Sequence, residues 1–466
     1  MRTEACSAVD EINLLSERPD EPNLHYVEAA LAGRLELPRL RAAVVDVLAA
    51  NPAARARIST TSPLRLWTQW AIPDIAETDP VLERTVASRR ELADAREEIF
   101  ATALPVRTGP LFRLHVLSQH RVTNLILAAH HARFDAYSAL GLLRAIASAY
   151  TGGEPLAPPA PPAPAAGGSS RPPRLQGPPL RIEAGRDARE KELPTDGYHF
   201  RHVAMEMRDL SNAASYYADA TVEDALLTEV ARAVYEWNAS RGKAWGQVRV
   251  TVPIDRRPAG QKALALGNHT GYGTVALDLA EVSGNPLASV SAQTRHLRTT
   301  AVEADAMART FAEPWAPFGI RRALKRPVDK RTASRVDSTM LANLGSVEKL
   351  WFGAVRTGAL WYAPPAPLPM GLAVGAVQYG NRMHLTLRYR RSMFSSAPFW
   401  GRGCPAPRDR RGNPAAARST RNPTRSTGGP NSRGVTTVGH SPSGRARSGW
   451  TAAVSAAPRR RASPPS

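Results

Sequence analysis

The sequence has few cysteines, no leader-like start and no long apolar run, and each absence excludes a class of protein. Its two cysteines, Cys6 and Cys404, lie at opposite ends of the 466-residue chain, which excludes a disulfide framework and a thiolate-rich zinc site. The start, MRTEACSAVDEINLL, is mixed in charge and lacks the apolar stretch of about 7–15 residues that a secretory signal needs. Nowhere do about 18 apolar residues follow one another, as a membrane span requires. We therefore expect a soluble, cytoplasmic protein.

Positive charge is abundant but unevenly placed. The chain holds 61 Lys and Arg against 41 Asp and Glu, a formal net charge of +20. Residues 397–466 contain 13 Arg, no Lys and one acid, Asp409, so this segment carries +12 and the first 396 residues carry only +8. The segment also has 10 of the 40 Pro and no Leu or Ile, so it has little apolar surface to offset the entropy of ordering. We expect residues 397–466 to be a disordered basic tail.

The tail allows three interpretations. Its charge suits a nucleic-acid-binding arm, because contacts to phosphates release counterions, but its arginines are scattered and its few aromatic residues form no stacking ladder. A second interpretation is that the tail is a solvated, disordered end without a partner. The apolar periodicity also stops near Ala397, directly after an expected strand, so we hypothesise an out-of-frame translation from about this point. Resequencing the locus tests that hypothesis, which requires a Leu- and Val-periodic helix in another frame.

A proline-rich segment divides the remainder of the chain. Residues 155–180 contain 10 Pro and no periodic apolar face, which favours a semi-extended connector over a packed element. We therefore expect a first subdomain at 1–154, a connector at 155–194 and a second subdomain at 195–396. The two subdomains are long enough to build their own cores and to enclose a site between them.

Both subdomains mix strand and helix patterns. Tyr26–Ala32 and Val122–Ala129 are typical of strands in the first subdomain. In the second, Thr221 suits the cap of a helix, GQVRVTVPI alternates as a strand with one buried face does, and Gly380-Asn381 suits a hairpin turn. The sequence therefore predicts an α/β (α+β) protein with two subdomains of comparable build.

The segment AAHHARFDAYS, residues 128–138, carries the clearest chemical signal. Adjacent histidines at the end of a strand point to opposite faces, so one packs inward while the other projects beyond the strand. A neutral imidazole there is able to accept a proton from a hydroxyl or an amine at neutral pH. Asp135 lies four residues after His131, where the loop enters the next helix, and there it either pairs with an arginine or caps the helix.

Each of these residues also has a structural interpretation. A pair of histidines is often a satisfied packing pair, and Asp135 suits an ordinary helix N-cap. No nearby Cys, Glu or His at helical spacing supplies a further ligand, so we expect no metal site. The chain lacks a Gly-x-Ser-x-Gly elbow, and Ser138 suits the start of a helix better than a nucleophile.

The stretch His130-His131-Ala-Arg-Phe-Asp135 resembles the His-His-x-x-x-Asp motif of the chloramphenicol acetyltransferase-like superfamily. That superfamily includes the condensation domains of nonribosomal peptide synthetases and stand-alone acyltransferases. Residues 26–58 are similar to its opening strand, helix and Asn/His-Pro-x-x-Arg turn, with Arg55 at the arginine. Further segments resemble the family in the same order, and together they cover roughly residues 5–395: TVEDALLTEVARAVYEWN, VTVPIDRRP with the later Gly267-Asn268, and Ala342-Asn343-Leu344-Gly345.

The resemblance implies two acetyltransferase-like subdomains arranged in a V, with the active site in a tunnel between them. Carried over by position, His131 is the general base or the group that positions the attacking hydroxyl or amine, and His130 is structural. Asp135 then orients the loop through an arginine, for which the candidates are Arg55, Arg256 and Arg257.

The implied reaction is acyl transfer from a thioester to a hydroxyl or amine acceptor, in secondary metabolism (nonribosomal peptide or polyketide) or lipid metabolism. The donor is an acyl-CoA or the phosphopantetheine thioester of a carrier protein, so the thioester is a co-substrate and no cofactor stays bound. The reaction needs neither a metal nor a covalent enzyme intermediate, so positioning and proton removal supply most of the acceleration.

Two departures from the family pattern keep alternatives open. Ala136 stands where the family usually has Gly after the motif Asp, and the second subdomain has no clear Asp-Phe-Gly-Trp-Gly element. These departures favour a stand-alone acyltransferase over a peptide-condensing domain, and they leave room for an inactive module that recruits a carrier protein. A nucleic-acid-associated protein is the less favoured alternative, because it depends on the tail alone.

Overall fold

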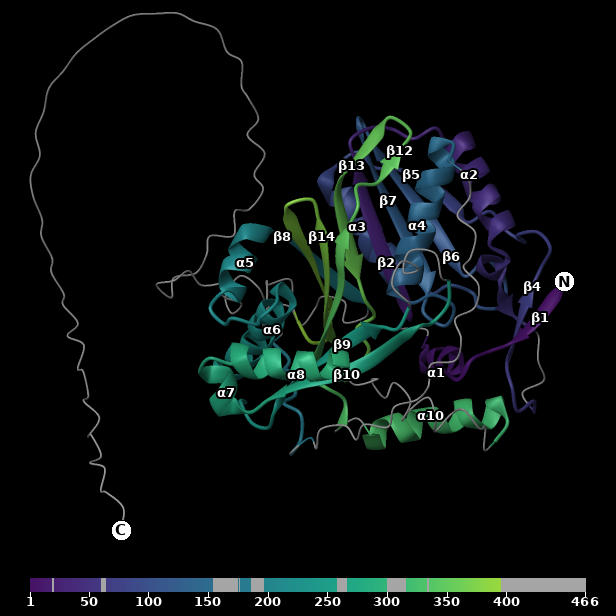
Figure 1. Ribbon diagram of the computed structural model, residues 1–466. Coiled ribbons are helices and arrows are strands. Elements are labelled where there is room, and N and C mark those ends of the chain that lie inside the picture. Colours follow the sequence, from purple (N-terminus) through teal and green to yellow (C-terminus); the bar gives the residue numbers. More distant parts are fainter. Residues whose placement is uncertain are drawn as a thin grey trace, which may run out of the picture. The chain divides into compact units, whose positions relative to one another are not determined.

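A computed structural model describes most of the first 394 residues (Figure 1). The described ranges are 1–18, 21–59, 64–153, 175, 177–185, 197–257, 266–299, 316–332 and 335–394. The expectations about the tail at 397–466, and those about most of the connector at 155–194, lie outside the described residues.

Two six-stranded mixed sheets organise this part of the chain. The first sheet has the order β12 (Trp351–Phe352), β13 (Val355–Ala363), β2 (Leu24–Leu31), β7 (Val122–His130), β6 (Phe112–Gln119) and β5 (Val81–Thr85). The second has the order β10 (Thr270–Leu277), β9 (Val248–Asp255), β11 (Thr339–Val347), β14 (Leu372–Tyr379), β15 (Arg382–Arg390) and β8 (Tyr198–Glu206). A small third sheet joins β1 (Arg2–Ala5), β4 (Gln69–Ile72) and β3 (Arg57–Ile58).

Helices cover these sheets. Around the first sheet and beside the third lie α1 (Ala8–Ser16), α2 (Leu37–Ala50), the 3-10 turn Pro52–Arg55, α3 (Arg89–Ala101) and α4 (Ala136–Thr151). Beside the second sheet lie α5 (Met207–Ala214), α6 (Val222–Ala239), α7 (Leu279–Ser283) and α8 (Leu287–Thr299). Helix α10 (Phe318–Thr332) contacts α1. In the described ranges, no helix combines the length and the apolar character needed to cross a membrane.

Strand β7 illustrates how the first sheet is buried on both faces. Leu125 and Leu127 pack into the core formed with α2 and α4, whereas Ile126 and Ala128 pack into a separate core with α3. Alternate residues of a strand point to opposite faces, so a nearly continuous apolar run is what a sheet covered on both sides requires. The end of β7 is therefore packed on both faces; His130 is its last residue, and His131 follows directly.

Several local predictions are confirmed. The two expected strands of the first subdomain are β2 and β7. Thr221 caps α6, and its hydroxyl accepts a hydrogen bond from the main-chain nitrogen of Asp224 in a capping box. Gly380, with a φ of 64°, turns β14 into β15 as a hairpin. The mixed α/β class with two sheets is confirmed as well.

The division of the chain differs from the expected boundaries in two places. Strand β13, expected in the second subdomain, pairs with β2 in the first sheet, so residues 351–363 complete the first subdomain. Within the expected connector, Leu180 and Ile182 pack into the second core: Leu180 is fully buried, and its nitrogen donates to the carbonyl of Gln247 over 2.6 Å. This short segment is buried because its apolar side chains pack into the core, although prolines surround it.

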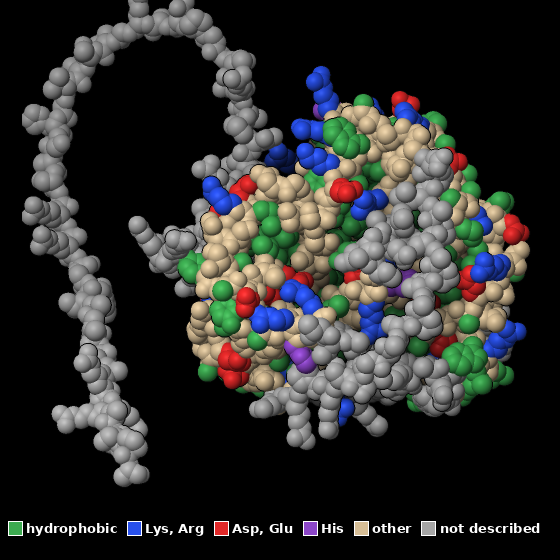
Figure 2. Space-filling model, viewed as in Figure 1, with side chains coloured by type: hydrophobic (Ala, Val, Ile, Leu, Met, Phe, Trp, Pro, Cys, Tyr) green, Lys and Arg blue, Asp and Glu red, His purple; other side chains and the backbone are tan. Residues whose placement is uncertain are grey.

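Charged side chains of both signs are mixed on one face of the described body. On the face shown in Figure 2, basic and acidic groups alternate without a large field of one sign. This distribution agrees with the modest +8 of the first 396 residues. This face gives little long-range steering toward one class of charged partner.

Candidate active site

The His-His segment occupies the end of β7, beside β2. His130 is the last residue of the strand and lies opposite Leu24 of β2. The nitrogen of His131 donates to the carbonyl of Asn23 over 2.9 Å, which anchors the loop to the chain that precedes β2. Helix α4 then begins at Ala136, with Asp135 as its N-cap. The strand, the loop and the helix thus fix the positions of both histidines.

His130 is fully buried and serves the loop itself. Its Nδ1 accepts a hydrogen bond of 3.1 Å from the nitrogen of Ala132, so the ring N–H lies on Nε2. That Nε2 lies 3.1 Å from a carboxylate oxygen of Glu17. His130 does not line the cavity described below, and its contacts suit a structural role.

Asp135 both caps α4 and forms an ion pair. Its carboxylate accepts from the nitrogen of Ser138 at 2.8 Å and takes a bidentate pair from Arg257, at 2.8 and 2.9 Å. The nitrogen of His269 and the hydroxyl of Thr270 donate to it as well. Burial alone would raise the pKa of Asp135, but Arg257 and these donors hold it below the usual value.

Of the three candidate arginines, Arg257 reaches Asp135. Arg55 instead donates to the main-chain carbonyls of Pro73 and Leu48, at 2.9 and 2.8 Å, and so satisfies the end of α2. The main-chain nitrogen of Arg256 bonds to the carbonyl of His269. The guanidinium of Arg257 also contacts Asp255 at 3.0 Å, so two carboxylates neutralise this buried charge.

His131 lies between the two sheets. Its side chain is almost entirely buried, and Nε2 is 3.1 Å from the hydroxyl of Tyr272 on β10. Asn268 donates to its carbonyl over 2.9 Å, which adds a second anchor from the loop before β10. Burial lowers the pKa of His131 below its ordinary value, and the charge of Asp135 only partly opposes this effect. The imidazole is therefore neutral at neutral pH and able to accept a proton.

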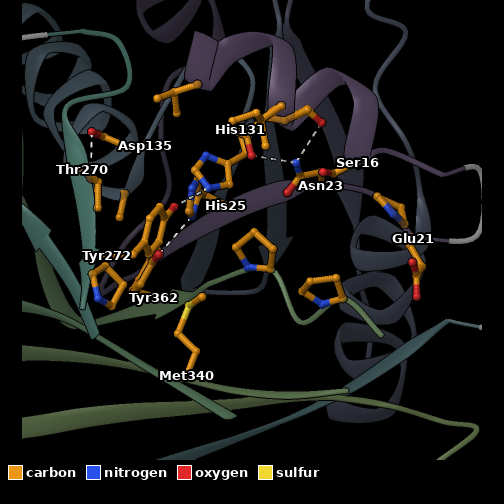
Figure 3. A pocket seen from close by; sticks show the side chains of 18 of the residues that line it. Ser16, Glu21, Asn23, His25, His131, Asp135, Thr270, Tyr272, Met340 and Tyr362 are labelled. Carbon is orange, nitrogen blue, oxygen red and sulfur yellow. Dashed lines mark hydrogen bonds between the residues drawn. The ribbon is translucent and has the colours of Figure 1, made fainter. Parts of the chain in front are cut away.

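A cavity of about 240 Å³ opens beside His131 (Figure 3). His25, His131 and Tyr362 reach it from the first sheet and its loop, and Thr270, Tyr272 and Met340 reach it from the second. Most of the lining surface is apolar, with prolines and aliphatic side chains from α1 and from the loop after β13. A few polar tips on an apolar wall suit a substrate with an apolar chain and one reactive polar group.

A second cavity, of about 360 Å³, adjoins the first. Pro253 lines both cavities. At the start of α4, Ala136 lines the first cavity and Tyr137 lines the second. The other walls come from α6, α8, β9 and β11, including Glu223, Asp255 and Arg298. The N-terminal turn of α4 thus stands between two spaces. Within the described ranges, no group of three or more His, Cys, Asp or Glu side chains is arranged to hold a metal ion.

Three residues of the first cavity were not singled out from the sequence: His25, Tyr272 and Tyr362. His25 lies one residue before the expected strand Tyr26–Ala32, and its hydroxyl partner Tyr362 is 337 positions away. No motif or spacing connects such residues. The one available signal was the polar His25 in an otherwise apolar stretch, which by itself has no chemical meaning.

The architecture is that of condensation domains, and the chain has the condensation-domain fold. A variant of the starter condensation domain of rhizomide synthetase, in complex with C8-CoA, matches with a TM-score of 0.58 at 15% identity over 84% of this chain and 90% of that chain. The first condensation domain of the calcium-dependent antibiotic synthetase gives 0.59 at 14% identity, over 84% and 92% of the two chains. SgcC5 from Streptomyces globisporus gives 0.53 at 16% identity, over 84% and 94%.

Among curated proteins, the chain is similar to two uncharacterized proteins of Mycobacterium tuberculosis: MT2362 of strain CDC 1551 / Oshkosh and Rv2305 of strain H37Rv. Each is 27% identical over 404 residues, which covers 82% of this chain and 93% of the relative. No protein-family model matches the chain. The comparisons thus define the fold, and the function must be argued from the site.

Proposed function

We propose that this protein transfers an acyl group from a thioester to a hydroxyl or amine acceptor, with His131 as the general base. The observation that carries the proposal is a neutral, buried imidazole that faces a cavity between the two sheets. The ion pair of Asp135 with Arg257 supports it, because it fixes the start of α4 directly after the His131 loop. His130 and Asp135 have structural roles in this proposal.

The proposed reaction proceeds in two steps. The acceptor takes the place of the Tyr272 hydroxyl at Nε2 of His131, gives its proton to that nitrogen and attacks the carbonyl carbon of the thioester. A bond forms from the acceptor atom to carbon, and the carbonyl electron pair moves onto oxygen. When the carbonyl re-forms, the carbon–sulfur bond breaks, and the thiolate takes the proton from the imidazolium.

The donor in this proposal is an acyl-CoA or the phosphopantetheine thioester of a carrier protein. The complex of a structural neighbour with C8-CoA supports an acyl thioester as co-substrate. The two adjoining cavities support separate access for donor and acceptor, because each has walls from both subdomains. We place the reaction in the secondary or lipid metabolism of the cytoplasm.

Transfer assays with a panel of acyl thioesters and hydroxyl or amine acceptors test the proposal. Wild type should release free thiol only when an acceptor is present, and His131→Ala should lose about 100-fold or more of kcat. His120→Asn is a matched control, because His120 lies in the exposed β6–β7 turn with a φ of 37° that Asn tolerates. A His131→Ala variant with full activity would contradict the assignment of the base.

Two observations favour the alternative of an inactive carrier-recruiting module. The hydroxyl of Tyr272 lies within hydrogen-bond distance of Nε2 of His131, the nitrogen that a base would use. In addition, Ala136 lines the cavity at the position where the family usually has Gly. Such a module would bind a carrier protein bearing an acyl-phosphopantetheine and release no thiol with any acceptor. Binding measured by calorimetry alongside the transfer assay separates the two functions.

A further inference from the structure

Two histidine–tyrosine pairs face the first cavity side by side. One pair is His131 with Tyr272, and the other is His25 of β2 with Tyr362 of β13. The rings of His25 and His131 lie 4.2 Å apart between centroids, in an edge-to-face arrangement. Figure 3 shows the two hydroxyls turned toward the two imidazoles. The proposed reaction uses only the first pair, so the second pair needs an explanation.

The hydrogen bond between His25 and Tyr362 defines which nitrogen holds the proton. Nδ1 of His25 is 3.0 Å from the hydroxyl oxygen of Tyr362, and Nε2 is buried without a partner among the described residues. Burial also lowers the pKa of His25 well below its ordinary value, so the ring is neutral and carries one proton. A buried N–H without an acceptor is rarer than an acceptor without a donor. The proton therefore belongs on Nδ1, which donates to the oxygen of Tyr362.

This arrangement leaves the O–H of Tyr362 available. Its oxygen accepts from His25, and in the described part of the chain its proton has no acceptor. Burial raises the pKa of Tyr362 well above its ordinary value, so the hydroxyl keeps its proton. Both residues line the cavity beside His131. A fixed O–H donor thus lies next to the proposed general base.

We propose that Tyr362 donates a hydrogen bond to the carbonyl oxygen of the thioester, and that His25 is the positioning residue that aims it. This inference rests on the acyl transfer proposed above and adds the group that stabilises the oxyanion. As the acceptor bonds to carbon, the carbonyl oxygen gains the electron pair, and the Tyr362 hydroxyl stabilises that charge without giving up its proton. The pair returns to carbon when the thiolate leaves. A donor prearranged in a dry site stabilises the transition state more than the bound substrate.

Kinetics on three kinds of variant test this role. Tyr362→Phe should lower kcat by about 100-fold or more with little change in KM, because the lost interaction strengthens only in the transition state. His25→Asn, which places an amide donor near the position of Nδ1, should retain more activity than His25→Gln or His25→Leu. Tyr26→Phe is the matched control, since Tyr26 is equally buried but its hydroxyl donates to main-chain carbonyls at the end of α3.

Infrared difference spectroscopy gives a readout without turnover. Octanoyl-CoA labelled with ¹³C at the carbonyl is bound in the absence of an acceptor, and a hydrogen bond from Tyr362 shifts the carbonyl band to lower frequency. Tyr362→Phe should abolish this shift, while Tyr26→Phe and His131→Ala should keep it. Comparable melting temperatures show that the variants are folded.

The outcomes distinguish the two proposals. If wild type transfers acyl groups while Tyr362→Phe keeps full kcat and the shifted band, the oxyanion role is wrong and the acyltransferase proposal stands. If wild type neither binds nor turns over any thioester, the acyltransferase proposal fails, and the role of Tyr362 fails with it. Loss of kcat and of the band shift in Tyr362→Phe alone supports both.

Discussion

Asp135 connects the two subdomains beside the proposed base. Its carboxylate belongs to the start of α4, whereas Arg257, His269 and Thr270 donate to it from the end of β9 and the start of β10. The contacts with Arg257 are buried, and the side chains of Asp135 and Arg257 are each 1% exposed. Removing one partner of a buried ion pair lowers the stability of the fold by far more than the intact pair contributes to it, because the remaining charge is buried without a counter-charge. The pair of Asp135 with Arg257 thus anchors the chain directly after His131, beside the main-chain contacts of His131 with Asn23 and Asn268.

Asp135→Asn should destabilise the protein by about 3–5 kcal/mol and lower kcat, because Arg257 loses one of its two carboxylates and the loop loses its anchor. Glu98→Gln is the matched control: Glu98 forms an exposed ion pair with Arg84, so its loss should cost at most about 1 kcal/mol. Denaturant unfolding of both variants measures the difference. An equal, small loss of stability in both would contradict the role assigned to Asp135.

Residues of this kind show what the sequence was able to predict. The His-His-x-x-x-Asp spacing was sufficient to locate His131 and Asp135, because it is a local pattern on one strand and one helix start. The choice among three arginines was not predictable, since it depends on how β9 approaches α4. His25 and Tyr362 were missed because their contact needs a strand pairing across more than 300 positions.

At the scale of elements, β13 joins the two sheets. It pairs with β2 in the first sheet, and its Trp361 stacks on His202 of β8 at 4.2 Å and meets the edge of His384 of β15 at 4.4 Å. Burial is the main cause that lowers the pKa of both histidines to about 4. Strand patterns such as those of β2 and β7 were predictable from periodicity, but the partner of β13 was not, because pairing is a long-range property.

These two histidines predict a pH dependence of stability. Their pKa is about 4 in the folded protein and near 6.5 in the unfolded chain, so below pH 6.5 the unfolded state binds more protons. The stabilisation is fully present above pH 6.5 and is lost between pH 6.5 and 4, by up to about 1.4 kcal/mol per pH unit for each histidine. Unfolding midpoints between pH 7 and 5 should fall less in a variant carrying His202→Gln and His384→Gln. An identical slope in wild type and variant would contradict this origin.

For the whole molecule, the charge divides between a described body and a tail. The first 396 residues carry +8 and contain both sheets, both cavities and every residue proposed to act. The last described residue, Phe394, is buried in the second core, and the carbonyl of Met393 accepts from Gly185. The end of the described chain is thus packed into the second core.

A chain that ends at Ser396 should keep the melting temperature and the thioester transfer of the full chain. Nucleic-acid binding should be confined to the full chain and should weaken steeply with salt, because the tail concentrates 12 of the 20 net positive charges in 70 residues. Parallel melting, transfer and binding assays on the two chains check this. A truncated chain that unfolds or loses transfer would show that the tail contributes to the fold, against this expectation.

The position of β13 has a consequence for synthesis on the ribosome. The first sheet needs β2, β7 and β13, yet more than 200 residues separate the end of β7 from the end of β13. At a translation rate of about 5–20 residues per second, one edge of β2 therefore stays unpaired for about 10–50 s, until β13 has been synthesised. An unpaired edge is a template for association between nascent chains, so we expect this protein to need chaperones during translation more than its finished fold indicates.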